Sequence, residues 1–181
     1  MIQRSYSSDG VVLSRRNYGE ADRILTVYSR NYGKLNLLAK GVRKPKSKKR
    51  GHIEVFSRIR FSASRGTGLD FLTEAETVDS FESVRKDLRR TSLAYYFCEV
   101  VSKITREEEK NEQIFDNFID NLSLLSKRSD LKSIRRYFVF KMLVILGFWP
   151  ENKKLDDVDR VLSEVTEREM SSVRIGKKML A

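Results

Sequence analysis

Two apolar segments joined by a turn occupy residues 23–39, RILTVYSRNYGKLNLLA. The first, Arg23–Tyr28, is rich in the β-branched and aromatic residues that suit a pleated surface. The turn signal Asn31-Tyr32-Gly33 separates it from the second, Leu35–Ala39. The stretch therefore predicts two short strands joined by a tight turn.

Segments of the same kind lie on both sides of it. Gly10–Ser14 precedes it and ends near the turn signal Asn17–Glu20, and a basic loop follows it. After that loop come Val55–Ala63 and Leu69–Thr77, separated by Arg65–Gly68. Five short strands within about 80 residues suit a small closed barrel, of which the OB-fold is one form. The pattern alone does not separate an OB-fold from an SH3-like barrel.

From about Glu82 the apolar residues recur at helical spacing instead. The predicted helices lie at residues 88–104, 114–125, 131–146 and 156–165, and Thr166 with Glu169 forms a possible capping box that opens a fifth. We therefore expect an α+β chain, with a small five-stranded barrel at residues 1–80 and an all-α helical domain at residues 81–181.

The positive charge is concentrated in the first half. The chain has a formal charge of +11, and residues 1–80 hold 16 Lys and Arg against eight Asp and Glu. Residues 81–181 hold 20 against 17. The predicted barrel therefore favours a polyanionic partner, either nucleic acid or an acidic membrane surface, and charge alone does not choose between them.

The sequence favours a cytoplasmic location over a membrane. Its most apolar run, Tyr137–Pro150, is interrupted by Lys141 and is too short to span a bilayer. The N-terminus lacks the apolar core of a signal peptide. The single cysteine, Cys98, excludes an intramolecular disulfide and fits a reducing compartment. We expect a soluble cytoplasmic protein with no membrane contact.

The loop Lys40–Gly51 is the most informative segment. Three of its residues, Gly41, Pro45 and Gly51, argue against a strand or helix. We expect a flexible basic arm at the rim of a binding face, where each cation contacts phosphate without reading sequence. The alternative is a solvated loop that aids solubility. Its seven cations are Lys40, Arg43, Lys44, Lys46, Lys48, Lys49 and Arg50.

Aromatic residues near the predicted strand ends could add base stacking, which favours single strands. The candidates are Tyr18, Tyr32 and Phe71, with Tyr32 ranked first, and packing within the barrel is the alternative for each. Arg15 and Arg16 could extend the basic face, although adjacent residues on a strand point in opposite directions.

Signals of an enzyme are missing from the sequence. There is no G-x-x-x-x-G-K-[ST] phosphate loop, and Gly66-Thr67-Gly68 is typical of a hairpin turn. A nucleophile pair would need Cys98 beside His52, yet Cys98 lies in an apolar setting typical of a buried thiol. Glu107–Glu109 suits a solvated helix end better than a metal site. We expect no catalytic residue, no metal and no cofactor.

Several segments resemble the RecO family of bacterial recombination mediators. The resemblance covers about residues 5–150 and is most specific in the first 80. In the first half it rests on residues 10–13, 18–28, 33–34, 39–43, 47, 51, 54–56, 68–69 and 72–76, and in the second on residues 134–150.

The resemblance implies an N-terminal OB-fold, a helical domain, binding of single- and double-stranded DNA, strand annealing, and help in loading recombinase with RecR. It implies that the seven cations of the basic loop contact DNA. It also implies that the acidic, apolar tail of single-strand-binding protein docks on the helix that carries Arg135 and Arg136. The alternative for these two arginines is a pair of solvated helix charges. The expected location is the bacterial cytoplasm, associated with the nucleoid.

One departure from the family concerns zinc. Many members carry a four-cysteine zinc ribbon after the Leu-Gly-aromatic-x-Pro segment, whereas Glu151–Leu155 follows here without a cysteine. We therefore expect no zinc. A rival interpretation is a protein-interaction adaptor whose basic loop docks an acidic protein. An unrecognised hydrolase is disfavoured, because no nucleophile–base pair is evident.

Overall fold

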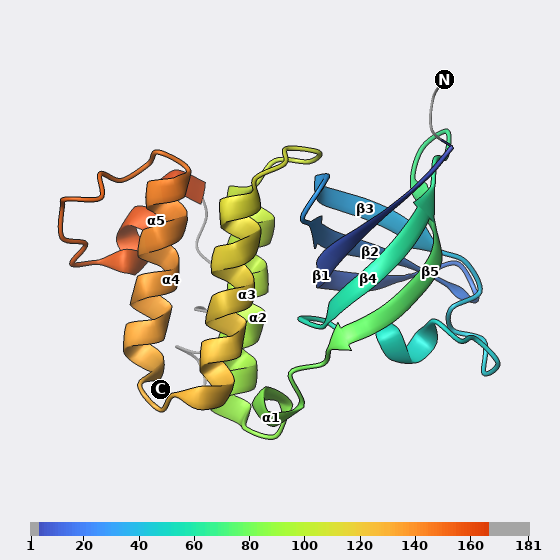
Figure 1. The fold of residues 1–181 in the computed structure, drawn as a ribbon, viewed down its shortest axis with the longest axis horizontal. Helices are drawn as coiled ribbons and strands as arrows, with labels where there is room; N and C mark the ends of the chain where they lie inside the picture. The colour runs from blue at the N-terminus through green and yellow to red at the C-terminus, as the bar shows by residue number, and fades with distance from the viewer. Residues whose placement is uncertain (1–3, 167–181) are drawn as a thin grey trace. The chain divides into compact units, whose positions relative to one another are not determined.

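The computed structural model describes residues 4–166. The chain folds into two compact units. The first unit holds the residues up to Ser80 together with Thr105–Asn111, and the second holds Phe81–Ile104 and the residues from Glu112 onward. Figure 1 labels the strands of the first unit and the helices of the second.

Five strands form a closed barrel in the first unit, in the order β1-β2-β3-β5-β4. All neighbouring strands are antiparallel except β3 and β5, which are parallel. This order and the parallel β3–β5 contact are those of an OB-fold and exclude an SH3-like barrel, so the predicted fold class is confirmed. The strands are β1 (Ser5–Tyr18), β2 (Asp22–Ser29), β3 (Gly33–Ala39), β4 (Arg58–Ser64) and β5 (Asp70–Asp79).

The barrel interior follows from the alternation of side chains along each strand. Leu25 and Val27 on β2 pair directly with Leu37 and Leu35 on β3, and all four belong to one buried cluster. Ile53, from the loop between β3 and β4, enters the same cluster and is fully buried. The loop therefore helps to fill the core that it crosses.

The fourth strand begins later than predicted. Val55–Ser57 forms a turn, because Phe56 has a positive φ of 55°. The N–H of Phe56 donates to the carbonyl of Val12 at 2.8 Å, and the N–H of Val12 donates to the carbonyl of Ser57 at 3.1 Å. This contact lies at the irregularity in β1 between Val12 and Ser14. The prediction of a strand from Val55 was wrong, because a buried turn has the same apolar composition as a strand.

The part of the second unit that the structure describes holds five helices joined by turns and loops, and no strand. Phe97 and Phe138 stack with ring centroids 4.0 Å apart in its core. The predicted fifth helix lies outside the described residues, and within them Thr166 ends α5 rather than opening a new helix. No helix in residues 4–166 is long and apolar enough to cross a membrane. The helices are α1 (Glu82–Arg85), α2 (Leu88–Ile104), α3 (Glu112–Lys127), α4 (Leu131–Ile145) and α5 (Val158–Thr166).

The β3–β5 seam closes the barrel with only two residue pairs, Leu37↔Asp70 and Leu38↔Phe71. Two segments cover the strand edges beyond this seam. The basic loop, Lys40–Gly51, runs along β5, and its Lys49 donates to the carbonyl of Leu72 at 2.8 Å. Thr105–Asn111, which we call the acidic strap, lies beside the start of β3, where Glu107 bridges to Lys34 (Figure 1).

Candidate nucleic-acid interface

The basic loop is a chain of turns fixed at both ends. Gly41 has a positive φ of 63°, and its N–H donates to the carboxylate of Asp22 at 2.7 Å. Val42 and Ile53 place their side chains in the barrel core, and a 3-10 turn, η1 (Arg50–His52), precedes Ile53. We expected a flexible arm, but two buried anchors hold the loop on the barrel.

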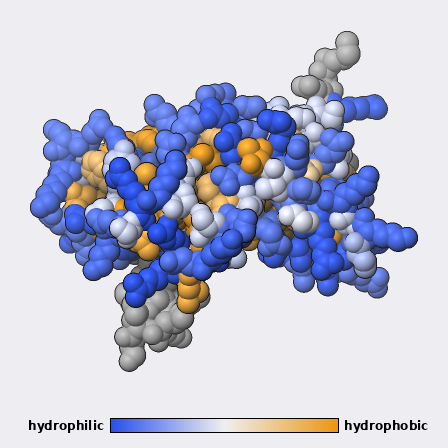
Figure 2. All heavy atoms as spheres, turned by 60° about the horizontal axis from the view of Figure 1, so that its bottom comes forward, coloured by the Kyte–Doolittle hydropathy of each residue, from blue (hydrophilic) through white to orange (hydrophobic). Residues whose placement is uncertain are grey.

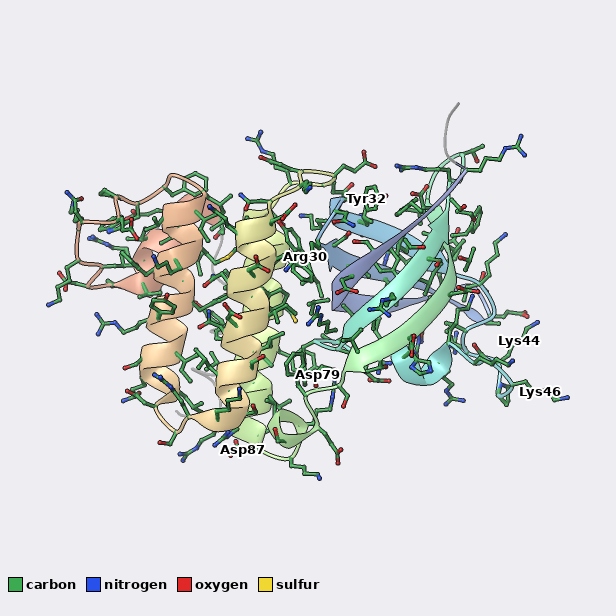
Figure 3. The ribbon with its side chains drawn as sticks, viewed as in Figure 1. Arg30, Tyr32, Lys44, Lys46, Asp79 and Asp87 are labelled. Carbon is green, nitrogen blue, oxygen red and sulfur yellow. The ribbon has the colours of Figure 1, made fainter. Side chains whose placement is uncertain are left out.

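Three lysines at the tip of this loop, Lys44, Lys46 and Lys48, are exposed to solvent. Figure 3 shows Lys44 and Lys46 pointing away from the barrel, and Figure 2 shows hydrophilic side chains over most of the visible face of this unit. Lys49 differs, because its hydrogen bond to β5 half-buries it and burial lowers its pKa. The loop thus has solvent-facing lysines at its tip, whereas Lys49 is hydrogen-bonded to the barrel.

Four arginines gather at the end of the barrel next to this loop. On the β1–β2 hairpin, Arg15 pairs with Leu25 and Asn17 pairs with Arg23, so both arginines lie on the core-facing side of the sheet, just beyond the apolar core. Burial lowers the pKa of Arg23, and the charges of Arg15, Arg43 and Arg50 lower it further. An electrostatic cost of this kind is reduced when an anion binds.

The carboxylate of Glu54 opposes these arginines. Glu54 forms a salt bridge with Arg15, and its charge acts on Arg23 in the opposite sense to the neighbouring arginines. Arg43 also donates to the carbonyl of Gly19 at 3.3 Å, which ties the loop to the β1–β2 turn. We call the basic loop together with Arg15 and Arg23 the basic pole. Sequence reasoning missed Arg23, although strand pairing across the Asn17–Glu20 turn would have placed it beside Arg15.

The predicted aromatic residues divide between the two ends of β3. Tyr32 lies at the end away from the basic loop (Figure 3), where its ring packs on Tyr6 with centroids 4.5 Å apart. Phe71 lies under Lys40, whose ammonium is 4.3 Å from the ring centroid. Tyr18, at the end of β1, is 52% exposed. Tyr18 is therefore the exposed aromatic residue at the basic pole, and Tyr32 is not close to the loop.

Arg16 is exposed and lies on the opposite side of β1 from Arg15, as strand alternation requires. His52 supports the loop: its Nδ1 accepts the N–H of Thr77 at 3.2 Å. Cys98 is buried in α2. Within residues 4–166, no group of three or more His, Cys, Asp or Glu side chains is placed to hold a metal ion.

Arg135 and Arg136 occupy different surroundings on α4. Arg135 forms an ion pair with Asp159 and lies 4.7 Å from the ring centroid of Tyr96. Arg136 donates to the carbonyl of Leu155 at 3.1 Å. It also lines a hollow of about 300 Å³ whose walls include the apolar groups of Tyr137, Phe140 and Leu155 and the cations Lys153 and Lys154. Arg136 thus borders a cavity, whereas Arg135 is engaged by Asp159 and Tyr96.

The barrel and its basic pole define the class: an OB-fold protein with a cationic face, followed in sequence by a helical domain. Comparisons with known proteins give the family. Two family models, recombination protein O N terminal and recombination protein O C terminal, match residues 1–81 and 85–154. The chain belongs to the RecO family.

Curated relatives agree with this assignment. A protein of Pelotomaculum thermopropionicum is 41% identical over 80% of this chain and 56% of its own length. A protein of Halalkalibacterium halodurans is 32% identical over 81% of this chain and 58% of its own length. A protein of Roseiflexus sp. is 31% identical over 93% of this chain and 59% of its own length. All three are named DNA repair protein RecO. The chain thus spans somewhat more than half the length of these relatives.

Proposed function

We propose that this chain binds single- and double-stranded DNA at the basic pole and acts in recombinational DNA repair without catalysing a reaction. The observation that carries this proposal is the cluster of Arg15, Arg23, Arg43 and Arg50 beside the Glu54 carboxylate, next to three solvent-facing lysines. Such an arrangement is electrostatically unfavourable alone and becomes favourable when phosphates release their counterions on binding.

Strand annealing follows from the same chemistry. Cations that contact phosphates without reading bases neutralise two complementary strands alike and lower the repulsion between them. Tyr18 can stack on a base while the neighbouring cations hold the backbone. This role requires no metal or nucleotide. Membership of the RecO family supports recombinase loading together with RecR, and such a role would associate the chain with the bacterial nucleoid.

We further propose that the tail of single-strand-binding protein docks at the hollow beside Arg136. An acidic tail with an apolar end needs a cation next to an apolar floor. Arg136, Lys153 and Lys154 supply the charge, and Tyr137 and Phe140 supply apolar surface. Phe138 is fully buried and cannot contribute to that floor.

The test of DNA binding is a salt series with the variant K44A/K46A/K48A. These lysines face solvent, so the barrel should fold normally. If three phosphate contacts are lost, the log–log slope for a single strand should become shallower by roughly 2, with weaker binding to all sequences alike. The control K127A/R128A/K132A removes three exposed cations from the second unit and should leave the slope unchanged. An unchanged slope in the loop variant would remove these lysines from the interface.

The tail-docking proposal is tested with Arg136→Ala. A tail peptide of single-strand-binding protein should bind roughly tenfold more weakly, because a charge-assisted hydrogen bond contributes about 1.5–3 kcal/mol. Naked-DNA binding should persist. Arg128→Ala, an exposed arginine outside this hollow, is the control. Normal peptide binding by Arg136→Ala would exclude the hollow. Failure to bind DNA, combined with tight binding of an acidic protein to the basic pole, would favour the adaptor function.

A further inference from the structure

The acidic strap is fastened to β3 by backbone and side-chain contacts. Lys34 and Glu107 form a parallel β-bridge, and the N–H of Glu108 donates to the carbonyl of Lys34 at 3.0 Å. Asn36 donates from its amide nitrogen to the Glu107 carboxylate at 2.6 Å, and the Lys34 ammonium donates to the carbonyl of Thr105. The glutamates that suggested a solvated helix end therefore lie across the barrel.

Gly33 shows how closely the strap approaches. It has a positive φ of 68°, and a Cβ at this position would clash with the backbone carbonyl of Glu109. Backbone atoms cannot move aside as the end of a flexible side chain can. Glycine is therefore required at residue 33 by both its dihedral angle and the strap above it.

The strap covers the outer side of β2 and β3. Tyr28 pairs directly with Lys34, and Thr26 pairs directly with Asn36. These residues point outward, because their neighbours Val27 and Leu35 belong to the core. The hydroxyl of Tyr28 reaches the strap and donates to the carbonyl of Asn111 at 3.3 Å.

The electrostatics of this surface match its burial. Burial raises the pKa of the Tyr28 hydroxyl, and the charge of Glu109 raises it further. Burial lowers the pKa of Lys34, while the charge of Glu107 acts in the opposite direction. The charge of Glu109 thus acts on Tyr28, and the charge of Glu107 acts on Lys34. These two side chains are the ones that could contact a nucleic acid.

An aromatic ring, a cation and an amide on the outer side of strands 2 and 3 are the groups with which OB-folds hold single strands. We propose that Tyr28, Lys34 and Asn36 form a second surface for single-stranded DNA, which the acidic strap covers. The strap carries three carboxylates against two cations, Arg106 and Lys110, and its excess negative charge keeps the polyanion away from this surface and directs it to the basic pole. This inference rests on the proposed binding of DNA by the barrel.

The first experiment removes the strap's charge and leaves its backbone in place. The full chain with E107Q/E108Q/E109Q is titrated with labelled oligothymidine and with a duplex of equal length at low ionic strength. We expect single-strand affinity to rise roughly fivefold, with a smaller change for the duplex. The control E74Q/E76Q/D79N removes three exposed carboxylates from β5 of the same unit. An equal rise in the control would mean that net charge alone acts, and would overturn the proposal.

The second experiment displaces the strap without changing any charge. Gly33→Ala forces Glu109 away from β3 and should expose Lys34, so the single-strand salt slope should become steeper by roughly 0.7. Gly147→Ala is the control, because Gly147 also has a positive φ, of 76°, and among the described residues nothing beyond its own neighbours lies within 4 Å of the added Cβ. A slope equal to wild type in Gly33→Ala would overturn the proposal.

K44A/K46A/K48A is included in the same titrations. If this variant binds more weakly and both strap variants bind like wild type, the covered surface is excluded and the basic pole stands. If wild-type protein binds neither oligothymidine nor duplex, the proposed function itself fails, and the inference fails with it.

Discussion

The two segments that cover the barrel seam differ in charge and in how they are fastened. The basic loop places Val42 and Ile53 in the core and exposes lysines at its tip. The acidic strap places no side chain in that core cluster, and its hydrogen bonds join it to Tyr28, Lys34 and Asn36. An apolar anchor contributes several kcal/mol, whereas a single hydrogen bond contributes about 1 kcal/mol. The loop is therefore anchored by apolar side chains, whereas the contacts between the strap and the barrel strands described here are polar.

The largest effect should come from the anchor of the basic loop. Ile53→Ala deletes a fully buried side chain from the barrel core and should lower the free energy of unfolding by about 2–5 kcal/mol. Denaturant unfolding measures this loss. Val78→Ala, at an exposed position on β5, should change stability by less than about 0.5 kcal/mol. A similarly small loss for Ile53→Ala would show that the loop is not anchored by its core contact.

Displacing the strap should cost less. Gly33→Ala combines the strain of a positive φ with a clash against Glu109, and should lower the free energy of unfolding by about 1–3 kcal/mol. Gly147→Ala, which carries the strain alone, should cost about 1 kcal/mol. Equal losses in thermal or denaturant unfolding would contradict the close contact between strap and β3.

Alkaline pH should loosen the strap side of the seam. The folded-state pKa of Tyr28 lies above its ordinary value of 10.0, because burial disfavours the phenolate. Its contribution to stability is therefore present below pH 10 and is lost as the pH rises above that value. Tyr28→Phe should reduce the alkaline loss of stability by at most about 1.4 kcal/mol per pH unit. Some loss should remain, since burial also raises the pKa of Tyr96, to about 12.

The smallest effect should come from Lys49, and with the opposite sign. Burial lowers the pKa of Lys49 in the folded state. Below that pKa the ammonium is charged in both the folded and the unfolded chain, and burying the charge costs stability. Stability from this group should therefore rise as the pH approaches the ordinary lysine value of 10.5. Lys49→Met should remove this rise and lose one hydrogen bond, with a net change of about 1 kcal/mol or less. A larger alkaline loss in Lys49→Met than in wild type is the measurable outcome, and its absence would contradict the assignment.

Strand-forming residues separated by turn signals, as in residues 23–39, were enough to predict a small five-stranded barrel. The choice of an OB-fold came from the resemblance to the RecO family. The start of β4 was missed because the turn at Phe56 is as apolar as a strand. Of the four clustered arginines, Arg15, Arg43 and Arg50 were predicted to belong to the site. Arg23 was missed, because its position near Arg15 depends on the register between β1 and β2. The strap could not be foreseen, because Glu107 lies 71 residues from Asn36 along the chain, and no local pattern encodes that contact.

The two-pair seam has a consequence for dissection of the protein. The N-terminal family model ends at residue 81, whereas the compact barrel unit also contains Thr105–Asn111. A fragment cut at residue 81 would carry β3 with its first half uncovered, and a bare strand edge is a template for pairing with another chain. Such a fragment should self-associate through β3 at high concentration, so its soluble yield would report edge protection as much as folding. A barrel made to stand alone needs its distant seven-residue strap joined back to it.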